Sequence, residues 1–197
     1  MALAPLHLAV FISGLGSNLD ALIKACAQAV FPARIKVVVS NRLDAGGLQK
    51  AEAAGIPTVI VDHKNFPSRD DFDDALLQAL KPYAIDLVCL AGFMRVLTPH
   101  FIDAWEGRLI NIHPSLLPDY KGLHTHERVI ADRRTETGCT VHHVVPDMDS
   151  GPIILQKTVK VLPNDTPAIL AARVLQQEHI AYPEAILMMA KKLLKKD

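Results

Sequence analysis

The chain of 197 residues has few cysteines and no excess charge of either sign. Its three cysteines, Cys26, Cys89 and Cys139, form no close pair and no CxxC motif, which argues against a disulfide framework or a cysteine zinc site and favours a reducing compartment. Lysine plus arginine and aspartate plus glutamate each total 21, so the formal net charge is zero. Without a basic excess, we expect small-molecule partners rather than nucleic acid or an anionic membrane.

Long apolar runs and a basic N-terminal targeting segment are also missing. The first apolar run, which begins at Leu6, is too short to span a membrane. No internal repeat, low-complexity tract or linker divides the chain. With 50% hydrophobic residues, 197 residues suffice for one buried core and are few for two. The sequence therefore predicts a cytoplasmic protein of one domain, residues 1–197.

Strand and helix patterns alternate through the first two thirds of the chain. Such alternation is typical of a parallel sheet with helices on both faces. Two later strands follow one another with only a brief turn between them, which predicts an antiparallel extension. The fold class is therefore α/β, with a Rossmann-like, mostly parallel sheet. We predict strands over residues 6–13, 35–40, 58–61, 87–91, 109–113, 140–145 and 153–161, and helices over residues 19–26, 47–54, 68–81, from 98, over 124–131, and from 166 with an interruption at Pro183.

A glycine-rich loop joins the first predicted strand to the first predicted helix. It contains Gly16, Ser17 and Asn18, and it places backbone N–H groups at a helix N-terminus where an anion can approach. The third glycine of a GxGxxG fingerprint is replaced by Leu19, and Asn41 stands where an acidic ribose ligand is expected. The loop thus favours a phosphomonoester over a nicotinamide dinucleotide, although a simple connecting turn is the alternative.

A second candidate site begins at the end of the fifth predicted strand. Asn111 and His113 are two residues apart, so their side chains leave the same face of the sheet. A lone strand histidine is more often structural than catalytic. Here an amide donor shares its face, and Asp149 in a later Asp-Ser-Gly-Pro turn can return a carboxylate to the same crevice. An amide, an imidazole and a carboxylate together suit stabilisation of an oxyanion and proton transfer.

These motifs resemble those of the phosphoribosylglycinamide formyltransferases, a folate-dependent family of purine synthesis, over nearly the whole chain. The order and spacing of the matching stretches are together highly specific. They are residues 13–18, 91–97, 111–118, 122–124, 151–156 and 177–179.

The resemblance implies roles for individual residues. The catalytic residues would be Asn111, His113 and Asp149. The phosphoribosylglycinamide substrate would be held by Gly16, Ser17 and Asn18 at its phosphate and by Leu175, Gln176, Gln177 and Glu178 elsewhere. The pocket for 10-formyltetrahydrofolate would include Arg69, Met94, Arg95, Val96, Leu97, Asn111, Val145, Pro146, Asp147, Met148 and Asp149. An arginine after an apolar strand, as at position 95, is often merely solvated.

The implied reaction is formyl transfer from 10-formyltetrahydrofolate to the amine of phosphoribosylglycinamide. Residues 1–105 would form the phosphate-binding half and residues 106–197 the folate-binding and catalytic half. The hypothesis assigns oxyanion donation to Asn111 and to protonated His113, with Asp149 raising the pKa of His113. The donor is a co-substrate; no metal and no nicotinamide are expected, and the protein would be a monomer or a homodimer.

Three alternatives use a similar fold. Formyltetrahydrofolate deformylase would deliver the formyl group to water, but it carries an N-terminal domain for which we expect no room here. Methionyl-tRNA formyltransferase normally adds a β-barrel and needs an RNA-binding surface. A non-catalytic folate- or nucleotide-binding module would be expected to have lost one of the three catalytic residues, and all are present.

Two histidine pairs look superficially like metal ligands. They are His124 with His126, and His142 with His143. Strand and loop polarity near a wet crevice is the simpler interpretation, and the implied transfer requires no metal.

Overall fold

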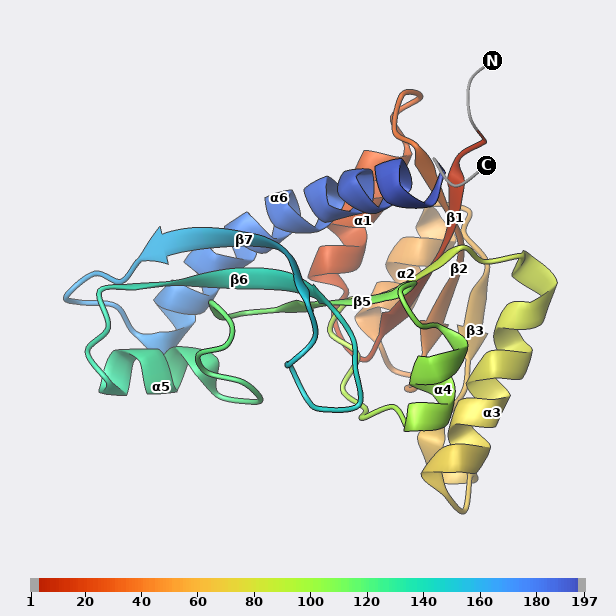
Figure 1. Ribbon diagram of the computed structural model, residues 1–197, viewed down its shortest axis with the longest axis horizontal. Helices are drawn as coiled ribbons and strands as arrows, with labels where there is room; N and C mark the ends of the chain where they lie inside the picture. Colours follow the sequence, from red (N-terminus) through yellow and green to blue (C-terminus); the bar gives the residue numbers. More distant parts are fainter. Residues whose placement is uncertain (1–3, 195–197) are drawn as a thin grey trace.

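The computed structural model describes residues 4–194, and its centre is a seven-stranded sheet with the order β3-β2-β1-β4-β5-β6-β7 (Figure 1). The first five strands are parallel, and β6 and β7 are antiparallel additions at one edge. The predicted mostly parallel sheet with an antiparallel extension is therefore confirmed. The strands are β1 (Leu6–Ile12), β2 (Ala33–Ser40), β3 (Thr58–Ile60), β4 (Leu87–Leu90), β5 (Leu109–His113), β6 (Glu136–His143) and β7 (Ile153–Lys160).

Helices cover both faces of the sheet. The even-numbered residues of β1, such as Leu8 and Val10, pack with α1, α2 and α6, whereas Ala9 and Phe11 pack with α3 and α4. This alternation follows from the two-residue period of a strand buried on both faces. The helices are α1 (Ser17–Cys26), α2 (Gly46–Ala53), α3 (Arg69–Leu80), α4 (Pro99–Ala104), α5 (Thr125–Ala131) and α6 (Pro167–Leu193), with short 3-10 turns at His63–Asn65 and Lys81–Tyr83.

Helix ends follow the signals in the sequence at most positions. Ser68 caps α3 by accepting a hydrogen bond from the backbone N–H of Asp71, as the capping pattern predicts. Thr166 caps α6 in the same way, with Pro167 in the first turn. Thr98 occupies the N-cap position of α4, but its side chain makes no capping hydrogen bond.

The predicted interruption of the last helix at Pro183 is wrong, because α6 runs without a break from Pro167 to Leu193. Proline removes one N–H donor from the helix interior. The flanking side chains of Tyr182, Ala185 and Ile186 are completely buried against the sheet, and this packing maintains the helix through the proline. In Figure 1 α6 crosses one face of the molecule from the β6–β7 end toward β1.

The predicted start of β6 is four residues late, since the strand begins at Glu136 rather than at Thr140. Gly138 lies in this part of the strand, and a glycine weakens the strand signal in the sequence. A Cβ atom there would lie 1.9 Å from the carbonyl oxygen of Lys157 on β7, so only glycine allows the two strands to pair this closely.

The three cysteines are free and buried, and burial raises the pKa of Cys26 and of Cys139 to about 12. None of the helices within residues 4–194 combines the length and apolar character needed to cross a membrane.

Strand register brings the ends of β1, β4 and β5 to one edge of the sheet. Phe11 pairs with Leu90, and Leu90 pairs with Asn111. Two strand spacings of ~4.8 Å therefore separate Phe11 from Asn111 by about 10 Å. Loops that follow these strands meet where open α/β sheets bind their ligands.

Tyr182 links α6 to this edge of the sheet. Its hydroxyl is buried and donates a hydrogen bond to the carbonyl oxygen of Leu90 at 2.9 Å. We expect Tyr182→Phe to lower the free energy of unfolding by about 1–3 kcal/mol, because the buried carbonyl loses a donor. The control is Tyr83→Phe, since no described hydrogen bond involves that hydroxyl. Urea denaturation measures both variants, and equal stabilities would contradict the assigned role of the Tyr182 hydroxyl.

Candidate active site

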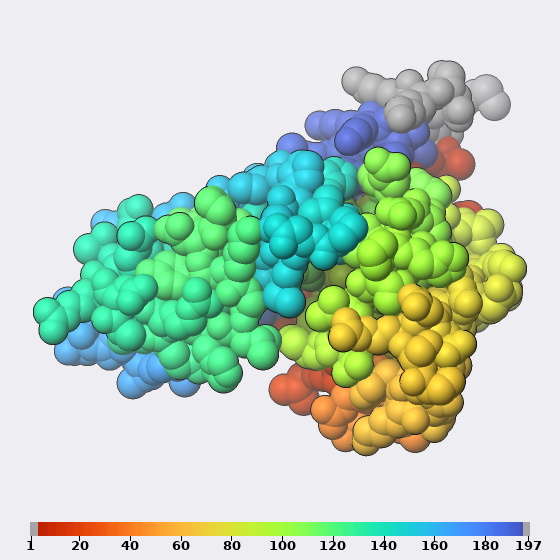
Figure 2. Space-filling model, turned by 60° about the horizontal axis from the view of Figure 1, so that its bottom comes forward, coloured from red at the N-terminus to blue at the C-terminus, as the bar shows by residue number. Residues whose placement is uncertain are grey.

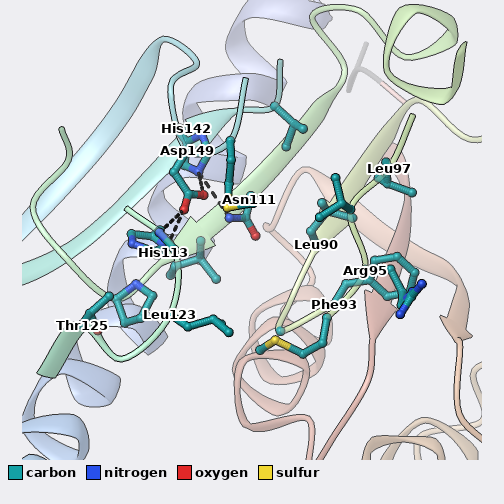
Figure 3. Close-up of a pocket in the computed structure, with 18 of the residues that line it drawn as sticks. Leu90, Phe93, Arg95, Leu97, Asn111, His113, Leu123, Thr125, His142 and Asp149 are labelled. Atoms are coloured by element: carbon teal, nitrogen blue, oxygen red, sulfur yellow. Dashed lines mark hydrogen bonds and ion pairs between the residues drawn. The ribbon is translucent and has the colours of Figure 1, made fainter. Parts of the chain in front are cut away.

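Four polar side chains meet at the carboxyl end of β5. Asn111 and His113 lie on β5, His142 lies on the antiparallel neighbour β6, and Asp149 belongs to the loop between β6 and β7. We call these four residues the polar cluster. Figure 3 shows them gathered on one wall of a cavity. The predicted proximity of Asn111, His113 and Asp149 is thus present in the structure.

Asp149 lies between the two imidazoles. Its Oδ2 is 3.4 Å from Nδ1 of His113, and its Oδ1 is 3.6 Å from Nε2 of His142. The backbone N–H of Gly122 donates to Asp149 Oδ2 at 2.9 Å. Asp149 has a left-handed backbone with φ of 50°, which turns the carboxylate back toward the sheet at some conformational cost.

His142 orients the Asn111 amide. Nδ1 of His142 lies 2.9 Å from the carbonyl oxygen of His143 and so carries a proton, which it donates. Nε2 of His142 then accepts from Asn111 Nδ2 at 3.2 Å. This contact uses one of the two N–H bonds of the amide and leaves the other free for a ligand.

His113 is held by two neighbours. Its Nε2 lies 2.9 Å from the carbonyl oxygen of Tyr120, a hydrogen-bonding distance. The Nδ1 contact with Asp149, at 3.4 Å, is longer. These distances assign the proton of the neutral ring to Nε2, which leaves Nδ1 able to accept a proton beside a carboxylate.

Burial controls the charge of His113. It lowers the pKa of the imidazole below its ordinary value, and the hydrogen bond to Tyr120 and the charge of Asp149 offset this only in part. The predicted effect of Asp149 is present, since its charge raises the pKa of His113, but the desolvation of a nearly inaccessible ring outweighs it, so the expectation of a protonated His113 is wrong. Unliganded His113 is neutral near pH 7.

Asp149 is ionised. Burial opposes its charge, but contact with His142, the Gly122 N–H and the neighbouring His113 together hold its pKa below the ordinary value. A carboxylate beside a neutral imidazole is poised to stabilise a proton that arrives on the ring.

The polar cluster faces a cavity of about 550 Å³, within the size range of small-molecule sites. Leu90, Phe93 and Leu97 form much of the opposite wall (Figure 3). In Figure 2 the cyan segment near residue 145 faces the yellow-green segment near residue 95 across a hollow. Met94, Val96, Leu123 and Met148 are exposed at its rim, and such an apolar rim is typical of a ligand site.

Most residues predicted for the folate pocket line this cavity. They are Met94, Arg95, Val96, Leu97, Asn111, Val145, Pro146, Met148 and Asp149. Arg69, the first residue of α3, and Asp147 are exposed and are not among the lining residues.

The glycine-rich loop at residues 16–18 has the geometry of an anion-binding site, which we call the anion seat or phosphate seat. Gly16 adopts φ of 67° directly before α1, and a Cβ atom there would lie 2.7 Å from the Cα of Gly47. The first N–H groups of α1 have no partner within the helix. Lys50 on α2 donates to the carbonyl oxygen of Gly16 at 3.3 Å and brings positive charge to the loop.

Helix α6 approaches the same loop through Glu178. Asn18 Nδ2 donates to Glu178 Oε2 at 2.6 Å, and both side chains are buried. Burial raises the pKa of Glu178, and the hydrogen bond from Asn18 only partly opposes it. No described hydrogen bond joins Leu175, Gln176 or Gln177 to the loop.

Sequence reasoning missed three contributors to these sites. The sequence favours strand and loop polarity near a wet crevice for His142, but this side chain is 2% exposed and contacts both Asn111 and Asp149. Its alternation with Thr140 on one strand face was a usable signal, but the register with β5 was unknown. Gly122 lies in a matching stretch, but its backbone contact with Asp149 has no sequence signal, and neither has the contact of Lys50 with Gly16. Within residues 4–194, no group of three or more histidine, cysteine or acidic side chains is arranged to hold a metal ion.

Comparison with known proteins gives consistent matches. The family described as formyl transferase matches residues 6–186. The phosphoribosylglycinamide formyltransferase of Escherichia coli is 45% identical over 92% of this chain and 85% of its own length. The trifunctional purine biosynthetic protein adenosine-3 of Homo sapiens is 48% identical over 93% of this chain, which spans only 18% of that protein.

Solved structures agree with these sequence matches. The phosphoribosylglycinamide formyltransferase of Coxiella burnetii has a TM-score of 0.90 and 48% identity, covering 95% of this chain and 88% of that one. Glycinamide ribonucleotide transformylase 1 of Symbiobacterium toebii has a TM-score of 0.93 and 44% identity, covering 95% of this chain and 89% of that one.

The electrostatics of the polar cluster can be tested without any ligand. We expect Asp149→Asn to lower the pKa of His113 further, because the carboxylate is one of the groups that raise it. Titration of the His113 ring by NMR measures this change. Asp147→Asn, in the same loop but exposed, is the control. A pKa of His113 that rises or stays constant in Asp149→Asn would refute the assigned charge contact.

Proposed function

The chain belongs to the formyl transferase family, and on that premise we propose that it is a phosphoribosylglycinamide formyltransferase. It transfers the formyl group of 10-formyltetrahydrofolate to the amine of N1-(5-phospho-D-ribosyl)glycinamide. The products are the N-formyl ribonucleotide and tetrahydrofolate, in a step of de novo purine (IMP) biosynthesis. Single-function relatives that the chain covers over most of their length carry this name.

One observation carries the proposal: an amide, an imidazole and a carboxylate meet at a cavity that lies beside an anion seat. The strand register separates the ends of β1 and β5 by two strand spacings, or about 10 Å. A phosphate at residues 16–18 and a reacting amine near Asn111 can therefore belong to one substrate molecule.

The proposed reaction makes one bond and breaks one. The neutral amine attacks the formyl carbon, the carbonyl oxygen becomes an oxyanion, and the bond from that carbon to N10 then breaks. The amine loses one proton and N10 gains one, so no further reactant is required.

We assign roles in this reaction from the contacts of the polar cluster. The free N–H of Asn111 donates to the oxyanion, and removal of one such donor typically costs ~10²–10³-fold in kcat. His113 accepts the amine proton on Nδ1 and returns it to N10. Asp149 stabilises the imidazolium that forms between these steps.

We assign the two substrates to the two neighbouring regions. Gly16, Ser17 and Asn18 bind the phosphate, and Glu178 with the preceding turn of α6 (Leu175, Gln176, Gln177) contacts the rest of the ribonucleotide. The folate co-substrate occupies the cavity, whose apolar walls suit a flat ring system. Arg69 and Asp147 remain proposed folate contacts, and their exposure places them outside the cavity itself.

Residues 1–105 supply the phosphate seat and residues 106–197 supply the catalytic groups, within one domain. The partners are small molecules, the location is the cytoplasm, and the protein is a monomer or a homodimer.

Turnover tests the proposal directly. The purified protein is mixed with 10-formyltetrahydrofolate, and release of tetrahydrofolate is followed with and without phosphoribosylglycinamide. We expect release only with the ribonucleotide. We also expect His113→Ala to lower kcat by ~10²–10⁴-fold, because the general base is lost.

His100→Ala is the matched control, since His100 is an exposed histidine on α4 that contacts Asp74. Release without the ribonucleotide would instead identify a hydrolase, and the absence of release would leave a binding protein. A His113→Ala variant with near-native kcat would contradict the assigned base.

The anion seat is tested by two glycines of one loop. We expect Gly16→Ala to raise the KM for phosphoribosylglycinamide at least tenfold, because its left-handed φ and the 2.7 Å approach to Gly47 exclude a Cβ atom. Gly14→Ala is the control, since a Cβ atom there meets nothing within 4 Å. Steady-state kinetics measure both, and equal KM values would place the phosphate elsewhere.

A further inference from the structure

One wall of the cavity is an irregular segment, residues 92–98. It follows β4, precedes α4 and contains neither helix nor strand. Phe93 and Leu97 are buried, whereas Met94 and Val96 are largely exposed at the cavity rim. The segment therefore needs support from outside itself to keep a fixed shape.

Ser13 supports the first half of this wall segment. Its backbone N–H donates to the carbonyl oxygen of Gly92 at 3.1 Å, and its Oγ accepts from the backbone N–H of Met94 at 2.7 Å. The same hydroxyl donates to Asn41 Oδ1 at 2.5 Å. Ser13 and Asn41 are both buried, so these hydrogen bonds are shielded from water.

Asp73 supports the other end. Its Oδ2 accepts from the backbone N–H of Thr98 at 2.6 Å, and the side chain, on α3, is completely buried. Its Oδ1 has no hydrogen-bond partner among the described residues. Burying a carboxylate in this way is costly, and the hydrogen bond it provides is directed at the end of the wall segment.

We propose that Ser13 and Asp73 are positioning residues that fix the wall segment from behind and thereby set the affinity for the folate co-substrate. This inference rests on the proposed function. Neither side chain is among the residues that line the cavity; each acts through a backbone N–H of the wall. Ser13 also directly precedes the glycine-rich loop, so one residue joins the phosphate seat to the folate wall.

A general structural role makes a different prediction from a positioning role. Loss of a structural contact lowers stability and affects both substrates alike. Loss of a wall anchor weakens folate binding and leaves kcat and the KM for phosphoribosylglycinamide nearly unchanged. Asp73 discriminates best, because it lies on α3 and does not adjoin the phosphate seat.

The test compares Asp73→Ala with Asp73→Asn. Alanine removes the acceptor for the Thr98 N–H, whereas asparagine retains one in its Oδ1. We expect Asp73→Ala to raise the dissociation constant of tetrahydrofolate, measured by calorimetry, and the KM for 10-formyltetrahydrofolate by about tenfold or more, since a hydrogen bond to a charged group is lost. Asp73→Asn should stay within about threefold of the parent.

Asp74→Ala is the control, because Asp74 is the next residue of α3, is exposed and contacts His100 on α4. It should leave tetrahydrofolate binding unchanged. Equal tetrahydrofolate affinity in the folded Asp73→Ala variant and the parent would overturn the proposal, as would equal losses for both substrates.

A second measurement requires no ligand and remains decisive if Asp73→Ala does not fold. In Ser13→Ala the acceptor for the Met94 N–H is removed, so amide hydrogen exchange at Met94 should be faster than in the parent. In Asp73→Asn an acceptor for the Thr98 N–H is retained, so exchange at Thr98 should accelerate less. Unchanged protection of the Met94 amide in Ser13→Ala would refute the proposed role of Ser13.

If the unmodified protein fails to bind tetrahydrofolate, the proposed function fails and the inference with it. If the unmodified protein binds tetrahydrofolate and the variants bind it equally well, only the inference fails.

Discussion

The carboxylate of Asp149, half-buried between two imidazoles, is the contact on which the candidate site depends. Three separate stretches of chain converge on it: His113 from β5, His142 from β6 and the backbone of Gly122 from the loop before α5. An unpaired buried carboxylate would be costly. The hydrogen bond from the Gly122 N–H offsets part of that cost, and the contacts with His113 and His142 join the loop between β6 and β7 to the sheet.

The same carboxylate explains the charge state of the site. Burial keeps His113 neutral, while Asp149 keeps its own charge. A neutral ring beside an anion can take up a proton during a reaction without holding one beforehand. Through His142, the arrangement also orients the amide of Asn111. Proton transfer and oxyanion stabilisation therefore depend on one connected set of hydrogen bonds.

Buried polar contacts hold irregular backbone at three places near the two candidate sites. Asn18 with Glu178 fixes the start of α1 against α6, Ser13 with Asn41 holds one end of the wall segment, and Asp73 holds the other. Apolar packing alone specifies backbone position less strictly than directed hydrogen bonds do. The sheet and its helices supply stability, and these polar contacts supply the geometry of the two neighbouring sites.

The sequence by itself determined the alternating elements, the mostly parallel sheet with its antiparallel edge, and the pairing of Asn111 with His113 on one strand face, because hydrophobic period and strand alternation are local properties. It also pointed to Asp149, first through its Asp-Ser-Gly-Pro turn and then through the resemblance of its motifs. Only the tertiary structure decided the register of β6 against β5, which brings His142 to Asn111, and the depth at which His113 is buried, which reverses the expected direction of its pKa. The unbroken course of α6 past Pro183 was likewise decided by packing against the sheet. Register, burial and packing depend on residues far apart in the chain, and no local pattern encodes them.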